Sequence, residues 1–218
     1  MRLRSQLDLP FLTEVEHYYT RKVLKYGATP LGVDWSCQST QELRFAQLLM
    51  LVNFAAPFAL NDLGCGYGAL LAYVVKHQSR CDIDYLGIDL SPAMIRAASK
   101  LWGRHRGAKF AIGSACSRTA DYSIASGIFN VKLGRSRREW EGAIEKMLVN
   151  LHSCSRRGFA VNFLAPLDLG QMQRIELYRT LPDPWCRFCE RNFDASVSLL
   201  GAYGLREFTL LVRYQKIN

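Results

Sequence analysis

Short apolar runs alternate with helix-type periodicity along most of the chain. Each run is brief and flanked by turn residues, as is typical of strands buried on both faces of a sheet. Between the runs, apolar residues recur every three or four positions, the spacing of amphipathic helices. The strands are expected at 59–63, 83–90, 108–112, 121–129 and 158–164, and the intervening helices at 69–77, 93–102 and 137–153. This alternation predicts an α/β fold with a mostly parallel sheet.

The pattern changes toward the C-terminus. Segment 197–214 holds two apolar runs around Ala202, Tyr203 and Gly204, which predicts a closing β-hairpin. Before it, segment 165–184 contains three prolines and is expected to form a long connection, of the kind that often carries function.

Two further helices precede the first strand. Segment 10–25 spaces apolar and aromatic residues three or four positions apart, as a helix that packs one face does. Segment 43–52 presents a second apolar face, and Ser39 or Thr40 is expected to cap its helix. We therefore expect an N-terminal helical cap at residues 1–56 and a single compact unit at residues 57–218.

The composition is that of an ordinary globular protein. The 218 residues are 49% hydrophobic and 22% charged, which suits one domain with a full α/β core. No run reaches the roughly 18 apolar residues of a membrane span. The first ten residues lack the apolar core of a signal peptide. We expect a cytoplasmic protein with no membrane partner.

The formal net charge of +9 is compatible with a nucleic-acid or acidic partner. However, the Lys and Arg residues are dispersed in small groups, without a long basic run interleaved with aromatics. The sequence disfavours a nucleic-acid partner but leaves it open.

Cysteine and histidine residues give little indication of metal or redox chemistry. The seven cysteines are an odd number scattered along the chain, which favours reduced thiols. Cys186 and Cys189 have C-x-x-C spacing, but no second Cys or His pair completes a metal site, so two half-buried thiols on a helix turn are favoured. The four histidines are isolated. We predict no metal.

Chemistry concentrates where the first strand meets its helix, at ALNDLGCGYG. Gly64 and Gly66 let the backbone turn sharply and approach a ligand, and the following helix directs unpaired N–H groups toward it. The glycines are spaced G-x-G-x-G, unlike the dinucleotide fingerprint G-x-G-x-x-G. Asp62 would repel a phosphate and attract a cationic amino group. A second acid, Asp89, ends the next strand, where such folds hold ribose hydroxyls.

These two motifs and the C-terminal hairpin resemble the class I S-adenosylmethionine (SAM) dependent methyltransferases, over about residues 58–214. The resemblance implies a Rossmann-like, seven-stranded, mostly parallel sheet of order 3-2-1-4-5-7-6, with helices on both faces. It also implies that the N-terminal cap is a lid. SAM is the implied cofactor and S-adenosylhomocysteine (SAH) its product.

The resemblance assigns the cofactor to several positions of this chain. The family often has Gly-Asp-Ala where Ser114 follows a glycine here, so a hydroxyl replaces the carboxylate that bonds the adenine amino group. Arg44 is either a contact to the cofactor's carboxylate or an exposed helix residue. The expected cofactor residues are Asp62, Gly64, Cys65, Gly66, Asp89, Leu90, Met94, Ser114, Ala115 and Arg44.

The acceptor side is less specific. Tyr19 and Asn130 are the candidate catalytic residues, and Asn130 could equally cap a turn. Aromatic side chains suit an N- or O-nucleophile because tyrosines hydrogen-bond amines and their ring faces attract cations. The candidate substrate residues, each of which could instead belong to the core, are Tyr18, Trp35, Phe163 and Tyr203.

The favoured function is transfer of a methyl group from SAM to an N- or O-nucleophile of a small molecule. In-line displacement needs positioning and exclusion of water rather than a covalent intermediate, which agrees with the lack of an obvious catalytic acid or base. One alternative is an RNA or protein methyltransferase. A second is a nicotinamide-dependent oxidoreductase or a non-catalytic nucleotide-binding module.

Overall fold

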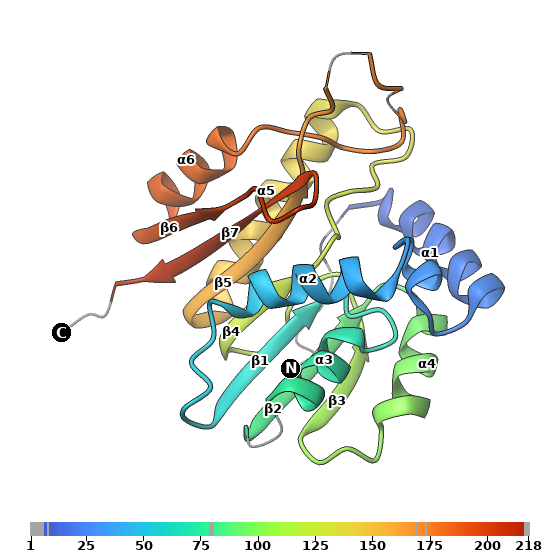
Figure 1. Ribbon diagram of the computed structural model, residues 1–218, viewed down its shortest axis with the longest axis vertical. Coiled ribbons are helices and arrows are strands. Elements are labelled where there is room, and N and C mark those ends of the chain that lie inside the picture. Colours follow the sequence, from blue (N-terminus) through green and yellow to red (C-terminus); the bar gives the residue numbers. More distant parts are fainter. Residues whose placement is uncertain (1–6, 8, 79–80, 169, 173, 216–218) are drawn as a thin grey trace.

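The protein is described by a computed structural model covering residues 7, 9–78, 81–168, 170–172 and 174–215 (Figure 1). Its centre is a seven-stranded sheet of order β3-β2-β1-β4-β5-β7-β6, as predicted. The strands are β1 (Phe58–Leu63), β2 (Ile83–Asp89), β3 (Ala108–Ile112), β4 (Ala120–Ala125), β5 (Ser155–Leu164), β6 (Ala195–Leu200) and β7 (Glu207–Tyr214). The helices are α1 (Leu12–Tyr26), η1 (Pro30–Val33), α2 (Gln38–Leu49), α3 (Ala69–His77), α4 (Pro92–Trp102), α5 (Arg137–Ser153) and α6 (Asp183–Asn192).

One strand of the sheet, β7, runs opposite to the other six. Strands β1 to β5 are mutually parallel, and β7 runs antiparallel to both β5 and β6. The predicted C-terminal hairpin is therefore confirmed. In the parallel part, Asp62 lies opposite Gly87 and Leu63 opposite Ala125. The ends of β1, β2 and β4 consequently meet at one edge, where α/β sheets bind ligands.

Several predicted boundaries differ from the structure; β5, for example, begins at Ser155 rather than at residue 158. Strand β4 ends at Ala125 rather than at residue 129, because Gly127 adopts φ 75° and turns the chain away. The helix α2 begins after Cys37, so neither Ser39 nor Thr40 is its N-cap. In the proline-containing connection Leu177 forms a bridge with Val131, and α6 already begins at Asp183.

Local sequence explains the helix starts that flank the ligand edge. Ser91 accepts a hydrogen bond from the Met94 amide at the start of α4, and Pro92 occupies the first turn. At α5, Ser136 and Glu139 form a capping box that satisfies two backbone amides. These caps fix where each helix leaves the sheet.

Apolar helix faces cover both sides of the sheet (Figure 1). One cluster joins α2 and α3 to the sheet through residues such as Leu48, Leu71 and Ile124. The other joins α5 to the opposite face through residues such as Trp140 and Phe159. Because both faces are buried, the central strands read as continuous apolar runs.

The N-terminal helix α1 packs directly on this unit. Leu12 and Val15 belong to the same apolar cluster as α5, and Val23 contacts Ala93 and Met94 of α4. The described residues do not include residues 1–6 and Asp8 of the predicted cap. They also do not include residues 216–218 of the predicted compact unit. Among the helices that are described, none combines the length and apolar character needed to cross a bilayer.

Candidate active site

A cavity with about 990 Å³ of empty space lies at the carboxyl ends of β1, β2 and β4, beneath α1. That space includes the part of the cavity that is open to solvent. The lining is mostly apolar, with a few polar side chains, as such sites usually have. Those polar residues are Glu16, Gln41, Asp62, Asp89, Ser114 and Ser126.

The turn after β1 exposes bare backbone to the cavity. Gly64 and Gly66 have φ of 77° and 54°, which side chains rarely adopt. A Cβ on Gly64 would lie 2.2 Å from the Ile128 side chain, and one on Gly66 would lie 2.8 Å from Val33. The amides of Gly64 and Cys65 donate to the Ile88 carbonyl, which fixes the turn against β2. Only glycine fits this approach.

Asp89 closes β2 and faces the same cavity. Its two carboxylate oxygens accept hydrogen bonds of 2.9 Å from the amides of Gly66 and Ser91. Burial raises the pKa of this carboxyl to about 6, although the two amides oppose the rise. Each oxygen keeps a further lone pair. Asp89 can therefore accept additional hydrogen bonds from a ligand.

Asp62 is the second carboxylate and is buried, with 2% of its surface exposed. It accepts a 2.5 Å hydrogen bond from the Tyr85 hydroxyl of β2. Burial raises the pKa of Asp62 to about 7; the Tyr85 hydrogen bond lowers it, and the charge of Asp89 raises it. Among the described residues, neither carboxylate has a Lys, Arg or His partner within 4 Å. The pair would favour a cationic ligand.

Two neighbouring groups complete this half of the cavity. Met94, at the start of α4, lines it with Leu90. Ser114 lines it after β3, and its hydroxyl accepts a 2.6 Å hydrogen bond from the Leu7 amide. The hydroxyl keeps its own proton to donate.

The opposite half is aromatic and lies at the end of β4. Tyr19 of α1 and Trp35 line it together with Ser126 and Gly127. Burial, followed by the charge of Asp34, raises the pKa of Tyr19 well above its usual range. Its hydroxyl is therefore protonated at neutral pH and can donate a hydrogen bond, but cannot act as a base.

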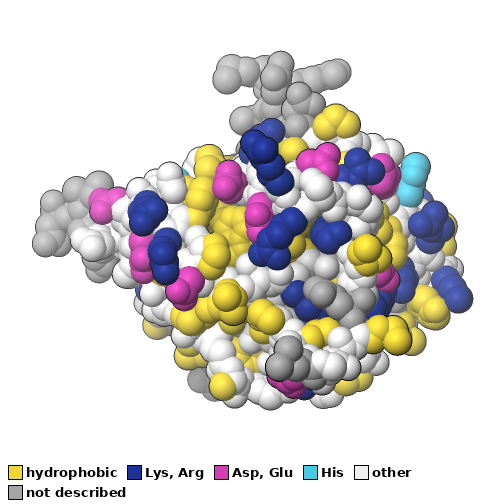
Figure 2. Space-filling model, turned by 90° about the horizontal axis from the view of Figure 1, so that it is seen from above, with side chains coloured by type: hydrophobic (Ala, Val, Ile, Leu, Met, Phe, Trp, Pro, Cys, Tyr) yellow, Lys and Arg dark blue, Asp and Glu magenta, His cyan; other side chains and the backbone are white. Residues whose placement is uncertain are grey.

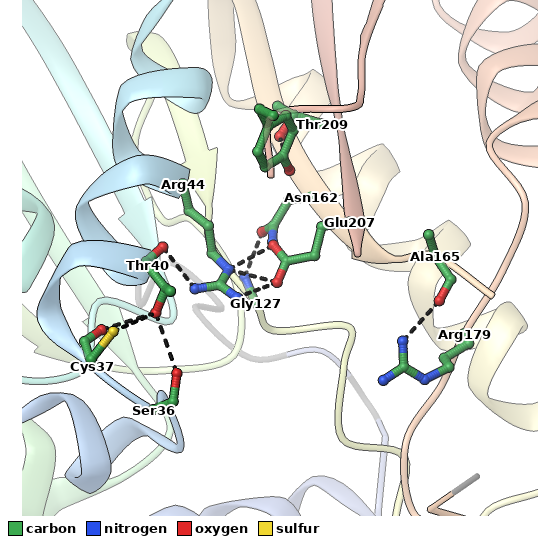
Figure 3. A network of polar contacts seen from close by, with 11 residues as sticks. Ser36, Cys37, Thr40, Arg44, Gly127, Asn162, Ala165, Arg179, Glu207 and Thr209 are labelled. Carbon is green, nitrogen blue, oxygen red and sulfur yellow. Dashed lines mark hydrogen bonds and ion pairs between the residues drawn. The ribbon is translucent and has the colours of Figure 1, made fainter. Parts of the chain in front are cut away.

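A buried polar network supports the Trp35 wall (Figure 3). The Arg44 guanidinium lies 3.6 Å from the centre of the Trp35 ring, and the Cζ2 atom of that ring lies 2.5 Å from where a Cβ on Gly127 would stand. Arg44 also pairs with Glu207 of β7, whose carboxylate accepts a 3.0 Å bond from Asn162.

The network reaches the end of β4 through Asn162. Its side-chain oxygen accepts a 2.8 Å hydrogen bond from the Gly127 amide. A chain of contacts thus runs from α2 through β7 and β5 to the cavity wall.

Comparison with known proteins gives the family of this fold and site. A family profile described as a methyltransferase domain matches residues 61–151. The candidate methyltransferase Rv1506c of Mycobacterium tuberculosis is 46% identical over 165 residues, which cover 76% of this chain and 98% of that protein. The chain belongs to the class I SAM-dependent methyltransferase family. The methyltransferase interpretation of the sequence is confirmed.

Solved structures share the fold of this methyltransferase at low identity. Magnesium protoporphyrin IX methyltransferase (ChlM) from Synechocystis PCC 6803 with bound SAM has a TM-score of 0.64 and 15% identity, covering 96% of this chain and 100% of that one. DhpI in complex with SAH has a TM-score of 0.65 and 15% identity, covering 95% and 99%.

The cavity of the methyltransferase brings together most of the predicted cofactor residues. Ala115 is buried behind it, and Arg44 is neither exposed nor in the lining, since it pairs with Glu207. The predicted residues that do line the cavity are Asp62, Gly64, Cys65, Gly66, Asp89, Leu90, Met94 and Ser114, together with Tyr19 and Trp35.

Four predicted acceptor-side residues lie outside the lining. Phe163 is fully buried, stacked against other core rings. Tyr203 shares a 3.1 Å hydrogen bond with Thr209, and Tyr18 donates to Asp34 at 2.5 Å. Asn130 is 5% exposed, and its amide nitrogen lies 3.5 Å from where a Cβ on Gly127 would stand. Asn130 is thus just behind the wall.

The sequence analysis missed Glu16 and Gln41 as lining residues. Glu16 had a usable signal: residues 12, 15, 16 and 19 follow one helix face, and all four line the cavity. Gln41 had none, because its place depends on how α2 packs. In the described part of the chain, no three His, Cys, Asp or Glu residues are grouped to hold a metal.

Proposed function

We propose that this methyltransferase transfers the methyl group of SAM to an N- or O-nucleophile of a small molecule. The observation that carries the proposal is a pair of carboxylates, the buried Asp62 and the half-buried Asp89. Both face one cavity beside the bare Gly64–Gly66 backbone and lack a cationic partner among the described residues. A ligand that carries a positive charge and hydroxyl donors would supply a partner for each carboxylate.

The residues around Asp62 and Asp89 fit SAM. When bound, SAM supplies a methyl group on a sulfonium, whose sulfur is the leaving group. Asp62 would hold the cationic amino group, and Asp89 would accept the ribose hydroxyls. Gly64 and Gly66 leave room for the ligand against the backbone. Met94 would pack on the adenine, and the Ser114 hydroxyl would donate to a ring nitrogen.

The acceptor side would position the nucleophile and exclude water. Tyr19 stays protonated and would orient an acceptor lone pair by donating to it. Ser126 has a buried hydroxyl with no hydrogen-bond partner in the described structure, so it suits a polar acceptor. Four residues of α1 form one wall, and we propose that the N-terminal segment to residue 56 serves as the lid. Positioning of this kind lowers the barrier without a covalent intermediate.

The acceptor class has two supports. ChlM, by its name, acts on magnesium protoporphyrin IX, a small molecule. On the face shown in Figure 2, Lys and Arg are interspersed with Asp, Glu and apolar side chains, in contrast to the continuous basic surface that nucleic acid favours.

The acceptor class can be tested by following the label from [methyl-³H]SAM. The purified protein is incubated with a bacterial extract separated into molecules below 1 kDa, RNA and protein. We expect label to appear in the small-molecule fraction only. An Asp89→Ala variant serves as the control for enzyme-dependent transfer. Label in RNA or protein would contradict the small-molecule acceptor, and no transfer to any fraction would contradict the proposed function.

SAM binding is expected to weaken as the pH falls. In the ligand-free protein, Asp62 and Asp89 have pKa values of about 7 and 6, and both must be ionised to hold SAM. Binding therefore releases protons below pH 7. For Asp62 alone, affinity should be about tenfold lower at pH 6 than at pH 8. Isothermal titration calorimetry in two buffers of different ionisation enthalpy measures both the affinity and the protons released.

Tyr85→Phe is the matched variant for this measurement. The Tyr85 hydrogen bond lowers the pKa of Asp62, so its loss should move the pH midpoint of SAM affinity upward. Tyr122→Phe, in β4, is the control because its hydroxyl contacts neither carboxylate. A pH-independent affinity would exclude Asp62 as the amine site. The stability of the ligand-free protein has the opposite pH dependence to SAM binding. The contribution of Asp62 to the free energy of unfolding falls as the pH rises from about 4 to 7, because the folded state holds the proton more tightly than the unfolded state.

A further inference from the structure

An incompletely paired guanidinium, that of Arg179, follows Tyr178, whose amide donates to the carbonyl of Asn130 behind the cavity wall. Arg179 belongs to the extended segment before α6 and forms a parallel bridge with Leu164, at the end of β5. One of its nitrogens donates to the Ala165 carbonyl at 2.8 Å, whereas its Nε is buried with no partner in the described structure. No carboxylate of the described residues lies within 4 Å of it.

The electrostatics around Arg179 favour an anion. Burial lowers the pKa of its guanidinium, and the nearby Arg206 lowers it further, whereas Glu207 raises it. Arg206 is itself paired with Asp168, and Glu207 is neutralised by Arg44. An arginine remains charged in such surroundings. Arg179 thus carries a positive charge that no carboxylate of the described residues pairs with at this edge.

Asn130 connects this position to the cavity wall. Its carbonyl accepts a 2.8 Å hydrogen bond from the Tyr178 amide, next to Arg179, while its side-chain amide packs against Gly127. Asn130 is only 5% exposed. Its side-chain Oδ1 atom has no hydrogen-bond partner among the described residues. An unpaired buried acceptor suits a ligand that donates a hydrogen bond.

The register of the sheet sets the spacing between these groups. Ala125 at the end of β4 lies opposite Val161, and Leu164, which pairs with Arg179, is three residues further along β5. At about 3.3 Å per residue, the backbone of Arg179 lies about 10 Å past the end of β4 along the strand direction. In Figure 3 the Arg179 guanidinium points from its backbone toward the side where Glu207 and Arg44 lie.

We propose that the methyl acceptor carries an oxyanion, a carboxylate or phosphate, that binds Arg179, and an N–H or O–H nucleophile that is held at Ser126, in front of Asn130. This inference rests on the proposed function, because it takes the end of β4 as the acceptor side. The guanidinium fork matches the two oxygens of such an anion. The acceptor is thus a hydroxy or amino carboxylate, or the corresponding phosphate.

The test uses the full chain loaded with SAH and follows the side-chain Nε–H signals of arginine by ¹H–¹⁵N NMR. Benzoate, phenyl phosphate and neutral benzamide are the probes, and the Arg179 signal is identified by its loss in Arg179→Lys. We expect saturable shifts with benzoate or phenyl phosphate, none with benzamide, and at least a tenfold loss of affinity in Arg179→Gln. The titrations give an affinity for each anion, and the anion with the higher affinity shows whether the site prefers a carboxylate or a phosphate.

Two controls separate the possible failures. Arg187→Gln removes the same charge from an exposed position of α6 and should leave anion affinity unchanged. SAH affinity, measured by calorimetry on the same samples, should be equal in Arg179→Gln, Arg179→Lys and the unaltered chain, which also shows that the variants fold. SAH binding without an anion shift at Arg179, or equal shifts with benzamide, overturns this inference. Failure of the unaltered chain to bind SAH overturns the proposed function instead.

Discussion

Replacing Asp89 with alanine is expected to abolish most of the stabilisation that SAM gives the protein. Two charge-assisted hydrogen bonds to ribose would be lost, each worth about 1.5–3 kcal/mol, so affinity should fall at least about 100-fold. SAM at 100 times the original dissociation constant stabilises the unaltered protein by about 2.7 kcal/mol. The same concentration should stabilise Asp89→Ala by only about 0.4 kcal/mol. Thermal unfolding with and without SAM measures the difference.

Asp84→Ala is the matched control for this loss. Asp84 lies on the same strand but outside the cavity, where it pairs with Arg118 at the surface. This variant should keep the full SAM-dependent shift. Asp89→Asn should retain part of it, since the amide oxygen still accepts one hydrogen bond but carries no charge. An unchanged shift in Asp89→Ala would remove Asp89 from the cofactor site.

Arg44→Met should destabilise the folded protein by about 3–5 kcal/mol. The variant leaves the Glu207 carboxylate, whose side chain is 2% exposed, without its charged partner. It also removes the planar group on which Trp35 rests. Urea unfolding followed by circular dichroism measures the free energy of unfolding.

Two further variants separate charge burial from general damage. Arg44→Met combined with Glu207→Leu should recover much of the stability, because a buried ion pair can be replaced by apolar residues at little cost. Lys76→Met breaks an exposed ion pair with Glu42 and should change stability by about 0–1 kcal/mol. If Arg44→Met lowered the free energy of unfolding by less than about 1 kcal/mol, the buried Glu207 carboxylate would not need Arg44 as its charged partner.

The sequence predicted the features that are set by neighbouring residues. The turn after β1 could be identified because Asp62 and the glycines lie within a few positions of one another. Closely spaced glycines indicate a sharp backbone turn that side chains would block. Helix α5 was placed with its observed bounds because its apolar period and its ends are both local signals. Strand order followed from family resemblance rather than from spacing.

Contacts between distant segments were beyond such reasoning. Arg44 and Glu207 are 163 residues apart, and nothing in the α2 sequence distinguishes a buried arginine from an exposed one. The hydrogen bond of Tyr85 to Asp62 likewise depends on the pairing of β2 with β1. Phe163 was expected at the ligand, but alternation on a strand buried on both faces does not identify the face that meets the ligand.

The hydrogen bond from the Leu7 amide to Ser114 has a practical consequence for handling the protein. An affinity tag fused ahead of Leu7 would begin only a few residues from the adenine half of the cavity and would compete with that bond. Purification handles on the N-terminal side are therefore better removed before binding assays.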